Sequence, residues 1–259
     1  MINIVEKSNF YKTNYIWFAD DVNDININVD INRLIIYGTK TKIERINNNK
    51  CICTKQETLI TDLTKPTDEL WGLLSKSLKH EINRSQRDSL IIKHFVGNEI
   101  SYKILQEFNK CYHEMYCEKG IDDVFLPINE LIMYANNNNL MISIALLNNI
   151  PVVYHSYVID DEHSRSFQSC SNFRIMGKDY RRAVGRANKF LHWNDILFLK
   201  EKGILEYDWG GVHSYKTPNG IDEFKISFNG KYKEYYNITC NLTLFAKFCS
   251  LLNRLKQII

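Results

Sequence analysis

Residues 180–211, YRRAVGRANKFLHWNDILFLKEKGILEYDWGG, predict a basic loop, a long amphipathic helix and a short strand, in that order. Gly203 is a natural end for the helix, and residues 204–209 are mostly apolar, as in a buried strand. A basic loop, a helix N-terminus and a returning strand together favour an anion site on a sheet flanked by helices. The apolar residues at helical spacing are Val184, Ala187, Leu191 and Phe198.

The loop carries the pattern Arg-x-x-Gly-x-Ala, from Arg182 through Gly185 to Ala187. Small residues in such a loop let the backbone approach a pyrophosphate, while the first N–H groups of the helix point at it. Arginines around the glycine add charge-assisted contacts to the same anion. A short pattern of this kind also arises by chance, in which case Gly185 only begins a helix. The residues expected to bind the pyrophosphate are Arg181, Arg182, Gly185, Arg186 and Ala187.

Together with residues 220–230, GIDEFKISFNG, this stretch resembles the Fem-type branch of the GNAT acyltransferase superfamily, which includes the enzymes that add amino acids to peptidoglycan bridges. The bridge-forming enzymes usually carry two GNAT-like domains, whereas this chain has room for about one and an appendage. The resemblance covers residues 66–245. Its matching residues are Trp193, Gly203, Tyr207, Asp208, Trp209, Gly210, Gly211, Gly220, Ile221, Phe224, Lys225, Phe228 and Gly230.

The order of elements along the chain is that of a GNAT domain, with a three-stranded antiparallel meander before the long helix. The expected fold class is α/β (α+β): a mixed, mostly antiparallel, twisted sheet flanked by helices, with a small β-rich N-terminal unit. We expect residues 1–65 to form the β-rich unit and residues 66–259 the acyltransferase domain. By resemblance, the pyrophosphate of the donor lies where the helix follows the meander, which is where the Arg182 motif falls.

Acyl transfer to an amine requires a neutral amine, a stabilised oxyanion and a leaving group. Candidate catalytic residues are Asp208, Lys225 and His155; by resemblance, Lys225 contacts a substrate phosphate or the developing negative charge. Each has a structural alternative: Asp208 caps the following Gly-Gly turn, Lys225 is a surface lysine, and a lone strand histidine is more often structural. The strand end before the loop, with Ser171, Asn172 and Phe173, is expected to supply oxyanion N–H groups and hold the donor.

A basic helical face in residues 67–87 carries Lys76, His80, Arg84 and Arg87, and it is either an anion-facing or a merely solvated surface. Glu223 is a further candidate base. The residues expected to contact the substrate are Arg84, Tyr157, Trp209 and Glu223.

Composition bounds the function further. The chain has 259 residues and a net charge of +3, so it shows no global nucleic-acid signature. Seven cysteines without framework spacing suit a reducing cytoplasm, and no apolar run or leader indicates export. No second Cys or His pair accompanies Cys51 and Cys53 at metal spacing, so no metal site is expected.

The expected function is therefore N-acyl transfer from acetyl-CoA to an amino group on a cell-envelope precursor, such as a nucleotide-linked amino sugar. One alternative is an aminoacyl-tRNA-dependent transferase acting on a peptidoglycan precursor. A second is a non-catalytic binding module that kept the fold. The expected partners are acyl-CoA and a small amine-bearing acceptor, with no DNA, and with tRNA only in the first alternative.

Overall fold

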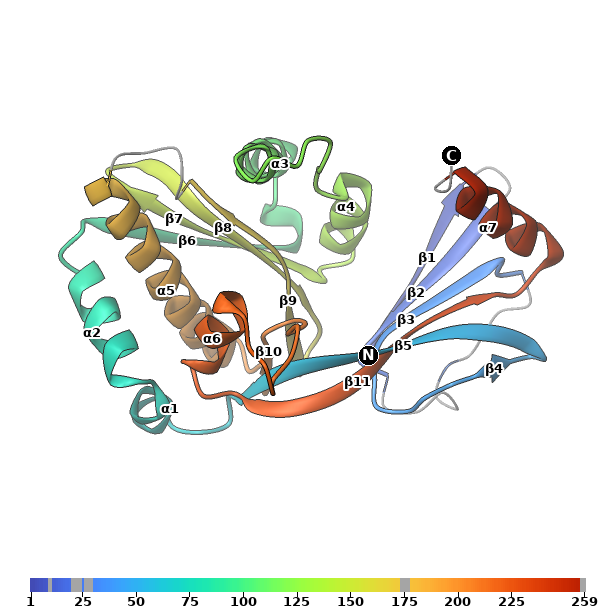
Figure 1. Ribbon diagram of the computed structural model, residues 1–259, viewed down its shortest axis with the longest axis horizontal. Coiled ribbons are helices and arrows are strands. Elements are labelled where there is room, and N and C mark those ends of the chain that lie inside the picture. Colours follow the sequence, from blue (N-terminus) through green and yellow to red (C-terminus); the bar gives the residue numbers. More distant parts are fainter. Residues whose placement is uncertain (9–10, 20–24, 26–29, 173–177, 257–259) are drawn as a thin grey trace. The chain divides into compact units, whose positions relative to one another are not determined.

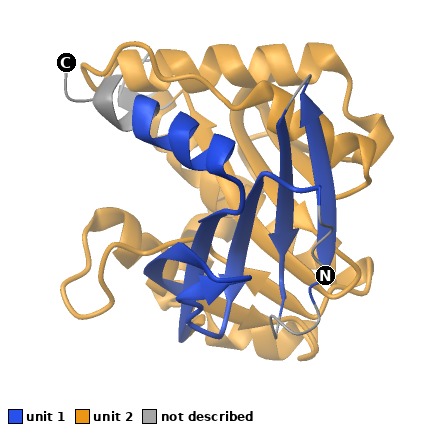
Figure 2. Ribbon diagram, turned by 90° about the vertical axis from the view of Figure 1, so that its right-hand side faces the viewer, with its two compact units in different colours: residues 1–58, 232–259 blue, residues 59–231 orange. Residues whose placement is uncertain are grey.

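The computed structural model describes the chain apart from residues 9–10, 20–24, 26–29, 173–177 and 257–259 (Figure 1). The chain divides into two compact units, Met1–Thr58 with Tyr232–Ile259, and Leu59–Lys231 (Figure 2). This division differs from the expected domain that ran from residue 66 to residue 259. The C-terminal segment groups with the N-terminal strands because β11 (Lys231–Asn241) pairs with β3 (Arg33–Thr39).

The sheet of the second unit follows the order β10-β9-β8-β7-β6, with the end of β5 (Asn49–Asp62) on the other side of β10. Neighbouring strands are antiparallel except for the parallel pair β9–β10. Asn148 and Asn149, both at positive φ, form the tight turn between β7 and β8. The strands are β6 (Leu90–Val96), β7 (Leu140–Leu147), β8 (Ile150–Ile159), β9 (His163–Ser171) and β10 (Glu206–Asp208). This mixed, mostly antiparallel sheet confirms the expected fold class.

Helices cover both faces of this sheet: α5 lies on one face, whereas α3 and α4 lie on the other (Figure 1). The helix expected over residues 67–87 is two helices, because Leu74 is extended and the Ser75 hydroxyl accepts the N–H of Leu78 to begin α2. The helices are α1 (Thr67–Leu73), α2 (Lys76–Ser85), η2 (Gly97–Glu99), α3 (Tyr102–Cys117), α4 (Ile128–Asn136), α5 (Lys178–Glu201) and α6 (Gly220–Ile226).

The core of this unit fixes α5 and α2 against the sheet. Leu78 and Ile82 of α2, Met141 of β7 and Ile196 of α5 belong to one buried cluster. Burial of such side chains contributes about 1.5–3 kcal/mol each, so this cluster rather than helix propensity holds the layers together.

Among its described residues, the first unit is a sheet with one helix, α7 (Leu244–Lys256). Its strand order is β1-β2-β3-β11-β5, and its core includes Ile16, Leu34, Ile36 and Ile238. The remaining strands are β1 (Ile2–Ser8), β2 (Tyr11–Trp17) and β4 (Arg45–Ile46). Among the described residues of both units, no helix is long and apolar enough to cross a membrane.

Candidate functional site

The sheet of the second unit opens at its only parallel pair among the described strands. Strands β9 and β10 are in register over three positions, from His163 opposite Glu206 to Arg165 opposite Asp208. Beyond Arg165, β9 continues to Ser171, whereas β10 ends at Asp208. Beyond Arg165, β9 therefore has no residue of β10 opposite it, and a ligand that entered there would meet the backbone of β9.

A β-bulge lies on the same stretch of β9. His155 of β8 is opposite Ser169, but Tyr157 is opposite Ser166, so β9 has one residue more than β8 between these pairs. The Ser156 hydroxyl holds the bulge, since it accepts the N–H of Gln168 at 3.0 Å and donates to the Gln168 carbonyl at 3.2 Å. Bulges are frequent next to active sites because they re-aim the backbone, and this one borders the opening.

The turn after β10 lies against this bulge. Gly210 has φ +67°, and a Cβ atom there would lie 2.7 Å from the Ser166 carbonyl oxygen. Only glycine can therefore occupy this position without moving β9 or the turn. Asp208 accepts the Gly210 N–H at 2.8 Å, and Lys225 donates to the Gly211 carbonyl at 2.7 Å. The two motifs of the sequence resemblance thus meet at one turn.

Through these contacts, Asp208 and Lys225 stabilise the turn after β10. The second carboxylate oxygen of Asp208 lies 3.7 Å from Nε of Arg165, so both of its oxygens face protein groups. Burial lowers the pKa of the Lys225 ammonium, although the nearby Asp208 carboxylate opposes this shift. Asp208 caps the turn that it was expected to cap, and both side chains hold this turn beside the opening.

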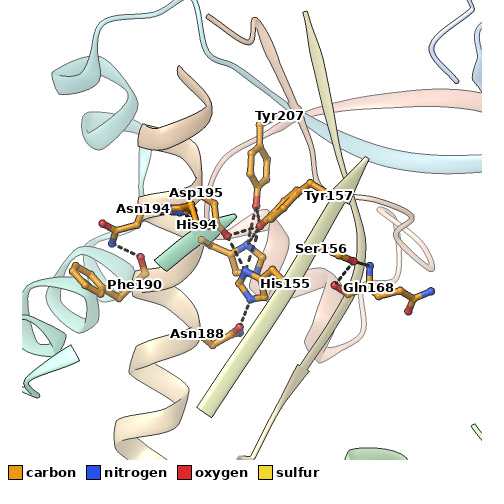
Figure 3. A network of polar contacts seen from close by, with 11 residues as sticks. His94, His155, Ser156, Tyr157, Gln168, Asn188, Phe190, Asn194, Asp195 and Tyr207 are labelled. Carbon is orange, nitrogen blue, oxygen red and sulfur yellow. Dashed lines mark hydrogen bonds and ion pairs between the residues drawn. The ribbon is translucent and has the colours of Figure 1, made fainter. Parts of the chain in front are cut away.

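A buried polar network lies on the α5 side of the sheet (Figure 3). Its centre is the Tyr157 hydroxyl of β8, which donates to Asp195 of α5 at 2.6 Å and lies 2.8 Å from the Tyr207 hydroxyl of β10. The same Asp195 oxygen is 2.8 Å from Nδ1 of His155, and the other is 3.0 Å from Nε2 of His94. One carboxylate therefore joins β6, β8 and, through Tyr157, β10.

The network continues along α5. Nε2 of His155 lies 2.8 Å from the side-chain oxygen of Asn188, and Nδ1 of His192 lies 2.8 Å from the Tyr207 hydroxyl. The rings of His155 and His192 stack with centroids 4.0 Å apart. His155, His192 and Asp195 offer ligand atoms within 4.8 Å of one another, a set that a metal ion can use. Hydrogen bonds to the two tyrosines and Asn188 already satisfy these atoms, so the group is stable as a hydrogen-bonded network.

Burial sets the charges of the network. It raises the pKa of Asp195, but the hydrogen bonds from His155 and His94 lower it, and the net pKa is below the usual value. Burial, with the Asp195 charge, raises the pKa of Tyr157 and of Tyr207, so both remain protonated. Burial, and next the nearby His155, lowers the pKa of His192, so this histidine is neutral beside the Tyr207 hydroxyl.

This neutral histidine predicts a pH dependence of stability. The unfolded chain takes up a proton on His192 below about pH 6.5, whereas the folded protein does not, so acidification favours unfolding. Between about pH 7.5 and about pH 5.5, the wild type should lose about 1.4 kcal/mol more unfolding free energy than His192→Asn, which keeps a polar side chain beside Tyr207. Urea unfolding at both pH values measures this difference, and equal losses would contradict a neutral His192.

Three of the expected site residues are buried in or beside this network. His155 and Tyr157 have no exposed surface and Trp209 has 1%, so none of them reaches a substrate in this structure. Trp209 instead donates its indole N–H to Thr61 at 3.0 Å within the core. Sequence reasoning missed the other members, His94, Asn188, His192, Asp195 and Tyr207. A signal existed for three of these, because Asn188, His192 and Asp195 are spaced by four and three residues, one face of a helix.

The Arg-x-x-Gly-x-Ala motif is not a loop. It lies inside α5, which begins at Lys178, so the N–H groups of residues 182–187 are in the helix interior and cannot cradle a pyrophosphate. Arg186 forms a two-pronged ion pair with Asp88, with contacts of 2.6 and 2.8 Å, and Ala187 is completely buried. Arg181 and Arg182 remain on the surface, and Gly185 is partly buried.

The expected donor contacts at the end of β9 also have structural partners. Ser171 pairs with Val153 in the sheet. The Asn172 side chain donates to the Pro151 carbonyl at 3.3 Å and accepts from the Cys111 thiol at 2.9 Å. Phe173 lies outside the described residues.

The basic face of α2 does border a pocket. His80, Asn83, Arg84 and Arg87 line a pocket of about 390 Å³, and both arginines are exposed. Ion pairs of Arg186 with Asp88, and of Lys189 with Glu81, tie α5 to this part of the chain. Arg84 therefore remains a candidate for binding an anionic ligand. Glu223, the other expected substrate contact, is exposed on α6.

No family model and no curated protein matches the chain. Solved structures do match it. FemX aligns with a TM-score of 0.61 at 11% identity, over 91% of this chain and 83% of FemX. The C-terminal domain of a putative lysylphosphatidylglycerol synthetase from Agrobacterium fabrum aligns with a TM-score of 0.56 at 10% identity, over 96% of this chain and 83% of that domain. L-PGS from Bacillus licheniformis aligns with a TM-score of 0.53 at 13% identity, over 86% of this chain and 72% of L-PGS.

At such low identities these likenesses establish the fold alone. They agree with the sequence resemblance, since FemX carries the name of the Fem-type group. The chain therefore has a GNAT-like fold.

Proposed function

We propose that the protein is an acyltransferase that moves an acyl group onto an amine at the opening between β9 and the turn after β10. The observation that carries this proposal is the parallel β9–β10 pair, which ends at Arg165 and Asp208 next to a bulge in a GNAT-like fold. An opening at the centre of a sheet offers backbone donors on a rigid frame, as an oxyanion requires.

In this proposal the bulge at residues 166–169 takes the place that the sequence suggested for residues 171–173. The tetrahedral oxyanion is held by backbone N–H groups of β9 beyond Arg165, while the Gly210 turn sets the width of the opening. Asp208, at the end of β10, is the candidate for receiving the proton of the acceptor amine. Lys225 and the Asp208 cap position the turn.

The acyl donor carries phosphate groups, which the pocket of Arg84 and Arg87 suits. Aminoacyl-tRNA is the favoured donor. The prediction of acetyl-CoA depended on the pyrophosphate motif, but that motif is helical and its Arg186 is paired with Asp88. Acetyl-CoA is the second candidate, since Arg181 and Arg182 are exposed near the start of α5. The resemblance to Fem-type enzymes indicates a peptidoglycan or other cell-envelope precursor as the acceptor.

Transfer of radiolabel to a nucleotide-linked peptidoglycan precursor tests this proposal. The enzyme is given labelled aminoacyl-tRNA in one reaction and labelled acetyl-CoA in another. Labelled product from the first alone supports the favoured donor, and product from the second alone selects acetyl-CoA. No product from either, with binding of neither donor, would favour a module without catalysis.

The basic pocket predicts a change in donor affinity. The double variant Arg84→Ala/Arg87→Ala should raise the KM for the donor about tenfold, or about 1.4 kcal/mol, because two charge-assisted phosphate contacts are lost. Lys103→Ala/Lys110→Ala removes two charges from α3 that are also exposed, and it should leave KM unchanged. Equal effects in both variants would mean that only net charge matters.

A further inference from the structure

Helix α7 presents an apolar face to solvent. Five large apolar residues on it are 42–83% exposed, whereas Ala246 is completely buried. Their spacing places them on one side of the helix, opposite the side that Ala246 packs against the first unit. Amphipathic helices normally bury this face, and a contiguous exposed apolar patch marks an interaction surface. The five residues, hereafter the α7 patch, are Leu244, Phe245, Phe248, Leu251 and Leu252.

The charges of this helix all have one sign. By sequence, Lys247, Arg254 and Lys256 are the only charged residues among residues 244–256, and no acidic residue accompanies them. At helical spacing, Lys247 falls along one edge of the α7 patch. An apolar face flanked by basic residues is typical of helices that lie in the interface of a membrane rich in anionic lipids.

A pocket next to the helix has matching chemistry. It has a volume of about 480 Å³ and lies between β5, β11 and α7 of the first unit. Lys50 and Lys247 supply positive charge, and Asn241 and Ser250 supply hydrogen-bonding groups. Leu251 belongs both to this pocket and to the α7 patch. A phosphate bound to the two lysines would thus lie beside apolar side chains, and a phospholipid likewise carries its phosphate next to apolar acyl chains.

The same charges disfavour a second copy of this chain as the occupant. In a symmetric dimer the patch would face itself, so the two helices would bring their positive charges together without an acidic partner from the helix. Like charges brought together in this way oppose association.

We propose that α7 docks the protein on an anionic phospholipid surface. The α7 patch enters the boundary between head groups and acyl chains, and the pocket of Lys50 and Lys247 binds a lipid phosphate. The helix lies in the plane of the interface and does not cross the bilayer. This docking is independent of the acyl-transfer proposal.

Vesicle co-sedimentation of the full chain tests this docking. The protein should sediment with vesicles of phosphatidylglycerol and phosphatidylcholine, and about tenfold less with phosphatidylcholine alone or at high salt. Phe248→Ser/Leu251→Ser should lose at least about tenfold in binding. Phe125→Ser, which changes a side chain of similar exposure in the second unit (54% against 58% for Phe248), should bind like wild type.

Charge reversal separates the two parts of the surface. Lys247→Glu should weaken binding to anionic vesicles, whereas Lys103→Glu, at an exposed site on α3, should not. Failure of the folded wild type to sediment with anionic vesicles would overturn the proposal. So would a stable dimer in light scattering that Phe248→Ser dissociates, because the patch would then be covered by a second copy.

Discussion

Replacing Asp195 by alanine is expected to lower the free energy of unfolding by about 3–5 kcal/mol, one of the largest effects of any single substitution in this chain. The carboxylate accepts hydrogen bonds from Tyr157, His155 and His94 at 2.6, 2.8 and 3.0 Å, and it has no exposed surface. Alanine would leave these buried groups without their acceptor, and buried unsatisfied polar groups are costly.

Urea unfolding of a graded set of variants measures this effect. Asp195→Asn keeps one acceptor oxygen and should lose less stability than Asp195→Ala. Asp161→Ala, in the exposed turn before β9, should change the unfolding free energy by no more than about 0.5 kcal/mol. If Asp195→Ala is as stable as the wild type, the network does not hold α5 to the sheet.

Gly210→Ala is expected to reduce kcat about 100-fold, since small displacements of a catalytic frame have effects of this size. The added methyl group would lie 2.7 Å from the Ser166 carbonyl oxygen, so either the turn or the bulge must move. Both border the opening proposed for acyl transfer, and their separation sets its geometry.

A second glycine provides the matched control. Gly203 follows α5 with φ +86°, and a Cβ atom there would meet nothing within 4 Å. Alanine at either position should cost about 1–2 kcal/mol of stability from the positive φ, but Gly203→Ala should retain the wild-type kcat. Equal kcat values in folded Gly210→Ala and Gly203→Ala would mean that the opening takes no part in the reaction.

The architecture could be predicted from the sequence where local pattern and packing agree. The meander, the long helix and the short strand after Gly203 all lie where alternation, helical spacing and turn residues placed them. The fold class followed from their order. The break at Leu74 was not visible, because the apolar spacing continues through it and only the Ser75 cap marks the new start.

The donor motif shows how packing overrides a local signal. Val184 and Ala187 are completely buried and pack with Ala145 and Val153 of the sheet. A glycine inside a helix costs about 1 kcal/mol, less than these contacts contribute, so the helix includes Gly185. The Asp195 network was beyond sequence reasoning for another reason: its members come from β6, β8, α5 and β10, which only the fold brings together.

The composition of the first unit from both ends of the chain constrains the order of folding. Ile36 pairs with Ile238, so during synthesis β3 lacks this partner until β11 has left the ribosome. Until β11 arrives, β3 has an unpaired edge, and such edges invite aggregation or chaperone binding. Prior folding of residues 59–231 shortens the loop that β11 must close, which lowers the entropic cost of completing the first sheet. Because this pairing joins segments about 200 residues apart, β11 is the element that completes the sheet begun by β1, β2 and β3.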